Sequence, residues 1–340
     1  MSKLMKVTVL LPSAVGRRNI FTIATLAIVL VGTLPMAAQT SNAPRDVSAP
    51  AVVHNTWSSG TAMPVGVWGS SVGVIKGEIY VVGGGTSAAI VADNQVYNPV
   101  ANTWSTGAAV PTTIFGAAVA VVKNDLYIFG GTVDGAAQTN AVWAYNPKTN
   151  AWSAKAAMPT ARQNAGAAVE NGIIYVVGGY SSAGGRLNTV ESYDPATDTW
   201  AELAPLLVGK SEPSVGLVGT TIVAADGMTS SGTNGDNEGY NASTNTWNSL
   251  TGDSNGRNEA CSGTIGTKFY VVGGANSGGS PVNVAESFSV KTNVWKSLAS
   301  MPQSVADAEG AEYKGRLFCF GGSSSATGGT VYDYVQIYQP

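Results

Sequence analysis

Four polar side chains recur at one position of a long sequence repeat and form the strongest candidate for a functional site. They are Asn164, Glu212, Glu259 and Asp307, which follow one another at intervals of 48, 47 and 48 residues, and Glu309 lies two residues further on. Carboxyl groups that are crowded into a narrow space have raised pKa values. Such a set suits the binding of a sugar or of a cationic peptide, and it also offers groups for acid–base chemistry.

Other residues are expected to lie beside these carboxylates. Trp68 and Phe115 stand next to the equivalent position in the first two repeats, where they would form an apolar wall opposite the acids. Tyr180 and Arg186 fall in a loop that follows a pair of glycines. The alternative is a solvated rim with no dedicated ligand, because loops are polar by default.

Composition excludes several kinds of chemistry. The only histidine among the 340 residues is His54, so the chain has no multi-histidine metal site, and we expect neither a metal nor a cofactor. The net charge is −3 and no basic cluster lies outside the N-terminus, so nucleic acid is not an expected partner. Cys261 and Cys319 have no CxxC partner; an oxidising compartment would permit a bridge, but two buried free thiols are the favoured expectation.

The N-terminal 38 residues have the pattern of a secretory signal peptide. Basic residues, among them Lys3 and Lys6, precede an apolar run at 20–31, and small residues follow it up to Ala38. Cleavage there leaves residues 39–53 as a flexible leader. Twin-arginine export and an uncleaved anchor remain open alternatives. We expect an exported bacterial protein, periplasmic or extracellular, with no other membrane contact.

Two markers divide the rest of the chain into repeats of 47 or 48 residues. The first marker is a tryptophan, at Trp57, Trp104, Trp152, Trp200, Trp247 and Trp295. The second is a Gly-Gly pair, which ends at Gly84, Gly131, Gly179, Gly227, Gly274 and Gly322 and is Asp-Gly in the fourth repeat. Each repeat carries four short strand signals separated by turn residues. Four antiparallel strands in a repeat of this length are typical of one blade of a β-propeller.

The aromatic residues also predict how the propeller closes. A Tyr or Phe precedes each later tryptophan by seven residues, but no tryptophan follows Tyr338. At the other end, Trp57 has no strand signals before it. We therefore expect an all-β, six-bladed propeller over residues 54–340, in which the N-terminal strand completes the last blade and removes an exposed sheet edge.

The repeated segments I-Y-V-V-G-G, V-x-x-Y-[DN]-P, T-[ND]-x-W and M-P resemble the Kelch repeat over residues 54–340. Most Kelch domains are interaction modules, and their usual ligand-binding face carries the loops after the double glycine. The resemblance therefore implies a binding module for a protein or a glycan as the leading hypothesis, with a carbohydrate-active enzyme as the alternative, and we expect the protein to be a monomer.

Two enzymatic alternatives follow from the same resemblance. An exported six-bladed Kelch propeller is similar to the periplasmic sialic-acid mutarotases, in which Glu and Arg serve acid–base roles. Glu212 or Glu259, with Arg186, would then carry the reaction, although the long insertions of that family are missing here. A copper oxidase resembling galactose oxidase needs two histidine ligands, and the single His54 excludes it.

A second set of charges is expected to be structural. Three repeats carry a base just before the inner strand and an acid in the third strand, whereas the other three repeats carry neither. Because base and acid occur together or not at all, we expect ion pairs within a blade rather than a basic cluster at the channel mouth. The expected pairs are Arg162–Glu191, Lys210–Glu238 and Arg257–Glu286.

Overall fold

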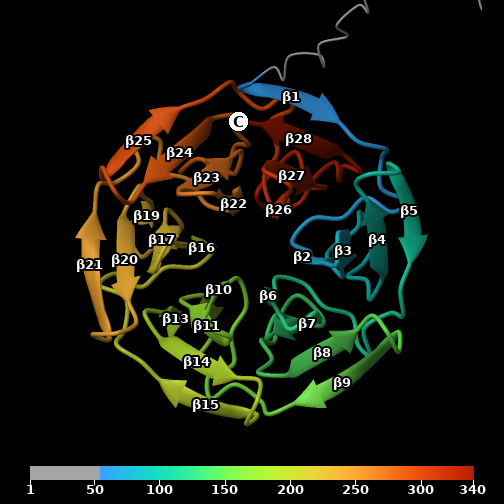
Figure 1. Cartoon of the computed structure of the whole chain (residues 1–340), viewed down its shortest axis with the longest axis horizontal. Coiled ribbons are helices and arrows are strands. Elements are labelled where there is room, and N and C mark those ends of the chain that lie inside the picture. The colour runs from blue at the N-terminus through green and yellow to red at the C-terminus, as the bar shows by residue number, and fades with distance from the viewer. Residues whose placement is uncertain (1–53) are drawn as a thin grey trace, which may run out of the picture. The chain divides into compact units, whose positions relative to one another are not determined.

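The computed structural model describes residues 54–340, and these form six four-stranded antiparallel sheets arranged in a ring (Figure 1). The all-β, six-bladed propeller predicted from the repeat is therefore confirmed. The predicted signal peptide and leader lie outside the described residues. Over residues 54–340 the structure contains no helix, and therefore none that is long and apolar enough to cross a membrane.

The first three blades follow the chain in order, each from its innermost to its outermost strand. Blade 1 consists of β2 (Ser71–Ile75), β3 (Glu78–Val82), β4 (Asn94–Asn98) and β5 (Thr103–Thr106). Blade 2 consists of β6 (Ala118–Val122), β7 (Asp125–Phe129), β8 (Val142–Asn146) and β9 (Ala151–Lys155). Blade 3 consists of β10 (Gly166–Glu170), β11 (Ile173–Val177), β14 (Val190–Asp194) and β15 (Thr199–Glu202), with a small hairpin of β12 (Tyr180–Ser181) and β13 (Gly185–Arg186).

The other three blades complete the ring. Blade 4 consists of β16 (Ser214–Val218), β17 (Thr221–Ala225), β20 (Asn237–Asn241) and β21 (Thr246–Leu250), with a hairpin of β18 (Met228–Thr229) and β19 (Gly232–Thr233). Blade 5 consists of β22 (Cys261–Ile265), β23 (Lys268–Val272), β24 (Ala285–Ser289) and β25 (Val294–Ser297). Blade 6 consists of β26 (Glu309–Tyr313), β27 (Arg316–Phe320), β28 (Val335–Gln339) and β1 (Thr56–Ser59).

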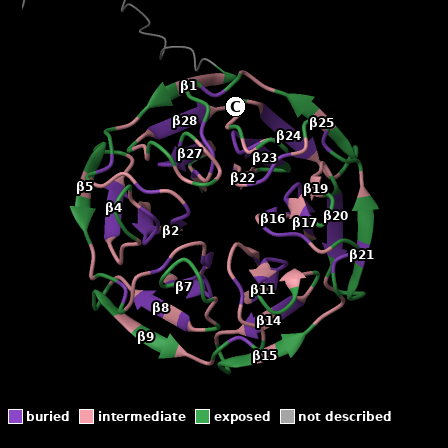
Figure 2. Ribbon diagram, turned by 180° about the vertical axis from the view of Figure 1, so that it is seen from behind, coloured by how far each residue is buried: buried purple, intermediate pink, exposed green. Residues whose placement is uncertain are grey.

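Burial explains the composition of the strands. The second strand of each blade, such as β11, is apolar because neighbouring blades cover both of its faces, whereas outermost strands such as β15 are largely exposed (Figure 2). Adjacent blades share their cores: Phe129 of blade 2 packs edge-to-face on Trp200 of blade 3, with ring centroids 5.7 Å apart. The core therefore lies between the sheets, around the ring.

The N-terminal strand closes the ring as predicted. β1 pairs antiparallel with β28, so that Trp57 lies opposite Tyr338 in the same register as the other Tyr–Trp pairs. Their ring centroids are 5.1 Å apart. The tryptophan that the last repeat lacks is thus supplied by the first strand.

A side-chain clamp joins each blade to the one before it and explains the Tyr–Trp spacing. In blade 2, Asn150 accepts hydrogen bonds from the Tyr145 hydroxyl and from the backbone N–H of Ala108, both at 2.7 Å, while Trp152 Nε1 donates to the Ala108 carbonyl at 2.8 Å. In each of the other blades, the Asn or Asp accepts from the N–H of one residue and the Trp Nε1 donates to the carbonyl of that same residue. The sets are Asn102 and Trp104 with Thr61, Asp198 and Trp200 with Ala156, Asn245 and Trp247 with Ala204, Asn293 and Trp295 with Thr251, and Asn55 and Trp57 with Ala299.

The double glycines allow the backbones of neighbouring blades to meet. The N–H of Gly131 donates to the carbonyl of Arg162 at 2.8 Å, and a Cβ on Gly130 would lie only 2.2 Å from that oxygen. Both glycines have positive φ. In blade 4, Asp226 occupies the position of the first glycine at a φ of 58°, which Asp tolerates better than most residues, so the turn is kept as expected.

The structure corrects the expectation of two free thiols, because Cys261 and Cys319 form a disulfide. Cys261 begins β22 in blade 5 and Cys319 lies in β27 of blade 6, and their Cα atoms are 5.8 Å apart. That distance lies within the usual range for disulfides. The two residues are 58 positions apart in sequence, and only the packing of adjacent blades brings them together.

Candidate functional site

One residue from each blade, placed just before the innermost strand, lines the mouth of the central channel. These residues are Gly69, Gly116, Asn164, Glu212, Glu259 and Asp307, here called the mouth ring. All six have φ between 55° and 62°, in the left-handed region. Gly69 and Gly116 adopt this conformation freely, whereas a Glu there is strained, at a cost of about 1 kcal/mol or more.

Backbone hydrogen bonds connect the mouth ring from blade to blade. Five of its residues donate their N–H to the carbonyl of the ring residue in the preceding blade, at 2.7–3.1 Å. Gly69 takes part by donating to Asp307, which carries the ring across the junction between the first and last blades. Because these amides are already bonded, the groups left to contact a ligand are mainly side chains.

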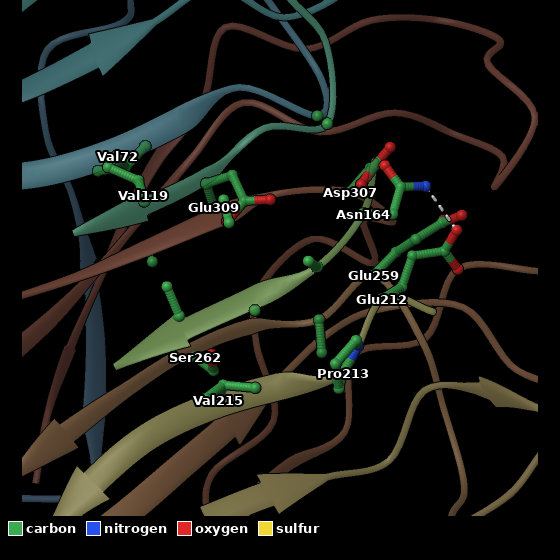
Figure 3. Close-up of a pocket in the computed structure, with 18 of the residues that line it drawn as sticks. Val72, Val119, Asn164, Glu212, Pro213, Val215, Glu259, Ser262, Asp307 and Glu309 are labelled. Atoms are coloured by element: carbon green, nitrogen blue, oxygen red, sulfur yellow. Dashed lines mark hydrogen bonds between the residues drawn. The ribbon is translucent and has the colours of Figure 1, made fainter. Parts of the chain in front are cut away.

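The mouth ring opens into a cavity of about 250 Å³. One arc of its wall is polar, with Asn164, Glu212, Glu259 and Asp307 grouped together (Figure 3). The other arc is made of Gly69, Gly116 and small apolar side chains of the inner strands. Figure 3 shows Glu309 apart from the other acids, beside Val72 and Val119. The cavity therefore has an acidic side and an apolar side, and Glu309 lies against the apolar side.

The carboxylates that line the cavity, which are those of Glu212, Glu259, Asp307 and Glu309, have few hydrogen-bond or ionic partners. Asn164 Nδ2 donates to Glu212 Oε1 at 2.8 Å, and Asn258 Nδ2 donates to Glu212 Oε2. Glu259 Oε2 is buried and has no hydrogen-bond partner. Within residues 54–340, no ion pair involves any of the four. Over the same residues, no group of three or more His, Cys, Asp or Glu is arranged to hold a metal ion.

Burial and mutual repulsion raise the pKa values of three cavity acids. The pKa of Glu259 lies well above its ordinary value, first because of burial and then because of the charges of Asp307 and Glu212. The pKa of Asp307 is also raised well above its usual range, by burial and by the Glu309 charge. Burial raises the pKa of Glu309 to about 7. The cavity can therefore hold neutral carboxylic acids at neutral pH, and these acids must lose protons before they can pair with a cation.

The structure does not bring all of the predicted mouth residues into this cavity. Trp68 and Phe115 are absent from its lining; their rings pack edge-to-face with centroids 4.6 Å apart. Tyr180 and Arg186 lie opposite each other in the β12–β13 hairpin, and the Arg186 guanidinium donates to Met228 Sδ. The apolar wall is thus made of small residues and valines instead of aromatic rings.

Asn258 was not singled out by the sequence, although it holds Glu212. It directly precedes Glu259, at a position that carries Trp68, Phe115, Gln163, Ser211 and Ala306 in the other repeats. A position that varies this much in size and polarity gives no signal that one of its side chains supports a carboxylate.

The structure forms all three expected ion pairs inside blades 3, 4 and 5, away from the mouth. Arg162 contacts Glu191 at 2.6 Å and Lys210 contacts Glu238 at 3.2 Å, and the side chains of both bases are completely buried. Arg257 contacts Glu286 in the same way. These bases connect the loop before the inner strand to the third strand of their own blade.

Arg257 holds two acids that the sequence comparison did not predict. Its guanidinium contacts Asp253 Oδ2 at 2.5 Å, and its Nε lies 3.5 Å from Asp226 Oδ2. Burial, followed by the Asp253 charge, raises the pKa of Asp226 well above its usual range. Asp226 is therefore the acid of this cluster that is best placed to be protonated.

Replacing Arg162 with methionine is expected to lower the free energy of unfolding by about 3–5 kcal/mol, because Glu191 would remain buried without its partner. Guanidinium titration followed by far-UV circular dichroism measures the change. The double variant Arg162→Met/Glu191→Gln carries no unpaired charge and should recover most of the loss. Ligand binding at the mouth should not change in either variant, and a single variant as stable as the wild type would show that the pair is not structural.

Comparison with known proteins agrees with this architecture. Residues 69–234 match the family model of the KLHDC2/KLHL20/DRC7 Kelch-repeats domain, and residues 256–302 match the Kelch motif. No curated protein matches the sequence. Among solved structures, that of YjhT superposes with a TM-score of 0.69 at 20% sequence identity, covering 82% of this chain and 96% of that chain, a likeness that shows the fold alone. The matched repeats and the six-bladed ring together place this chain in the Kelch-repeat β-propeller family.

Proposed function

We propose that this Kelch propeller is an exported binding module whose ligand, a protein or a glycan, occupies the mouth of the central channel. The observation that carries the proposal is the cavity of about 250 Å³, which presents on one arc carboxylates that have no counter-ion within residues 54–340 and on the other an apolar wall. Ligand sites in proteins commonly combine an apolar concave surface with a few convergent polar groups. Kelch propellers generally act as protein-interaction modules.

Features outside the cavity agree with this proposal. The Cys261–Cys319 disulfide is typical of proteins that reach an oxidising compartment, which supports export. Arg162, Lys210 and Arg257, the three bases that precede the inner strands, are buried inside the blades. The cavity lining contains carboxyl, amide and hydroxyl groups but no base. Such a lining can recognise a ligand through hydrogen bonds and charge without a catalytic base–acid pair of the Glu–Arg type.

The test is a glycan-array screen together with a pull-down from the parent organism, each carried out with the wild type and with a channel-blocking variant. Ser262 faces the cavity from β22, so Ser262→Trp is expected to fill the mouth. Thr197→Trp, in an exposed turn at the outer edge of blade 3, is the matched control. A true mouth ligand binds the wild type and Thr197→Trp but not Ser262→Trp. Ligands that bind all three proteins equally would place recognition elsewhere and contradict the proposal.

A sugar-ring isomerase is the second candidate, and the raised pKa of Glu259 favours it. A carboxyl that is protonated near neutral pH can donate to a ring oxygen, while Glu212 could accept the anomeric proton. Arg186 does not line the cavity, and the carboxylate of a sialic acid would face four acidic groups. Exchange NMR with sialic acid and with neutral sugars tests this candidate: anomer exchange that the protein does not accelerate eliminates it.

A further inference from the structure

The cavity carboxylates differ from the other buried acids of this protein. Away from the mouth, buried acids lie next to a base: Glu191 has Arg162, Glu238 has Lys210, and Glu286 has Arg257. The mouth acids have no such partner within residues 54–340, although three of them lie on adjacent blades of one ring. What this site lacks, by comparison, is a positive charge.

The local geometry shows that the missing partner is a hydrogen-bond donor. Glu259 Oε2 is buried with no partner, and Asp307 and Glu309 make no side-chain hydrogen bond. Five of the six ring amides cannot fill this role because they bond to the neighbouring blade. Asn164 and Asn258 are the nearby amides, and both already donate to Glu212.

The fold itself does not require acids at these positions. Gly69 and Gly116 occupy the same place in blades 1 and 2 with the same positive φ and without strain. Glu212 and Glu259 both have a strained backbone, and the Glu259 carboxyl is also desolvated and crowded by the neighbouring acids Asp307 and Glu212. Three unfavourable features at one spot indicate a binding role, because strain of this kind clusters at ligand sites.

We propose that the mouth binds a primary alkylammonium group, held between Glu212, Glu259 and Asp307, with its alkyl chain against the small-residue arc and Val119. This inference rests on the proposed binding function and names the ligand class. An ammonium group has three donors and no acceptor, which matches the oxygens without partners that these carboxyl groups offer once they are deprotonated. A flexible alkyl stem can lie on an apolar wall while its charged end is bound elsewhere. Glu309, beside that wall, would receive a second ammonium of a diamine.

Binding of such a cation should strengthen as the pH rises. The titratable groups that line the cavity are the four acids Glu212, Glu259, Asp307 and Glu309. Glu259, Asp307 and Glu309 have raised pKa values and must lose protons to pair with an ammonium, and the pKa of Glu309 is raised to about 7. An alkylamine stays protonated up to about pH 10. Affinity should therefore increase between about pH 6 and pH 9, in the opposite direction to a ligand that needs neutral carboxylic acids.

Isothermal titration calorimetry with four probes tests the inference on the full chain. The probes are 1,4-diaminobutane, n-butylamine, butan-1-ol and a blocked lysine tripeptide. The two amines should bind, with the diamine tighter, and the alcohol should not. Binding of the blocked tripeptide as well would identify a protein lysine as a source of the group, whereas binding of the free amines alone would identify a small metabolite.

Matched variants locate the site. Glu259→Gln and Asp307→Asn should weaken amine binding by about 30-fold or more, while Glu202→Gln, which removes an exposed acid from the outermost strand of blade 3, should leave it unchanged. Thermal unfolding shows that each variant is folded. Amines that fail to bind, or that bind Glu259→Gln as well as the wild type, overturn this inference. If another ligand still binds the wild type but not Ser262→Trp, the proposed binding function stands and only the assignment of an ammonium ligand is overturned.

Discussion

Replacing Trp57 with alanine is expected to lower the free energy of unfolding by about 3–5 kcal/mol, which is the usual cost of removing a packed tryptophan. Trp57 packs on Tyr338 and donates to the Ala299 carbonyl at 2.8 Å, so it connects the N-terminal strand to both blade 6 and blade 5. Its loss would weaken the junction that closes the ring. The same variant should also expose the edge of β28, and association of the protein through that edge is expected at high concentration.

The matched control is Trp152→Ala, which removes the equivalent side chain from a blade that is continuous in sequence. Trp152 packs on Tyr145 and donates to the Ala108 carbonyl, also at 2.8 Å. If the ring is closed in solution, denaturant titration should give similar losses for the two variants. A wild-type midpoint for Trp57→Ala, together with a large loss for Trp152→Ala, would show that β1 is not docked and would contradict the closure.

Much of the architecture could be predicted because the same contact recurs in each repeat, so its residue types appear several times in the sequence at the same spacing. The spacing from Tyr145 to Trp152 predicted paired strands, and the absence of a tryptophan after Tyr338 predicted that Trp57 would complete blade 6, as the pairing of β1 with β28 confirms. The Asn or Asp two residues before each tryptophan stood out in the sequence only as part of the T-[ND]-x-W segment. That it also holds the preceding blade depends on backbone atoms 42 residues away, which no local pattern reveals.

Contacts that occur only once were harder to predict. Arg162 and Glu191 could be matched because base and acid occur together in three repeats. The disulfide has no counterpart in the other blades, so Cys261 and Cys319 gave no such signal and were expected to be free. Asp226 stood out in the sequence only as the residue that replaces the first glycine of the marker in the fourth repeat, and its proximity to Arg257 follows from the packing of blade 4 against blade 5.

At the mouth, comparison of the six repeats predicted which backbone positions line the channel, but not where every neighbouring side chain lies. The repeat placed Glu212, Glu259 and Asp307 correctly around the cavity because one position per blade faces the axis. Trp68 and Phe115 were expected beside them, one position earlier in the repeat. Their rings pack on each other instead, with centroids 4.6 Å apart.

Replacing Arg257 with methionine is expected to cost more than Arg162→Met, and to unfold the protein at neutral pH. Breaking one buried ion pair costs about 3–5 kcal/mol, but Arg257 is shared by Asp226, Asp253 and Glu286. Without the guanidinium all three carboxyl groups would be buried with no cation in contact. Far-UV circular dichroism during thermal unfolding at several pH values measures the effect.

The pH dependence of this variant distinguishes lost charge pairing from lost packing. Burial already raises the pKa values of Asp226 and Glu286 in the wild type, and removal of Arg257 should raise them further. The folded state then binds more protons than the unfolded state, so stability should fall as the pH rises above about 4, by about 1.4 kcal/mol per pH unit for each extra proton. The variant should therefore refold on acidification. Adding Asp226→Asn, which keeps a residue suited to positive φ, should restore part of the stability at neutral pH and reduce the slope. A loss of stability that does not change with pH would mean that Arg257 acts through packing alone.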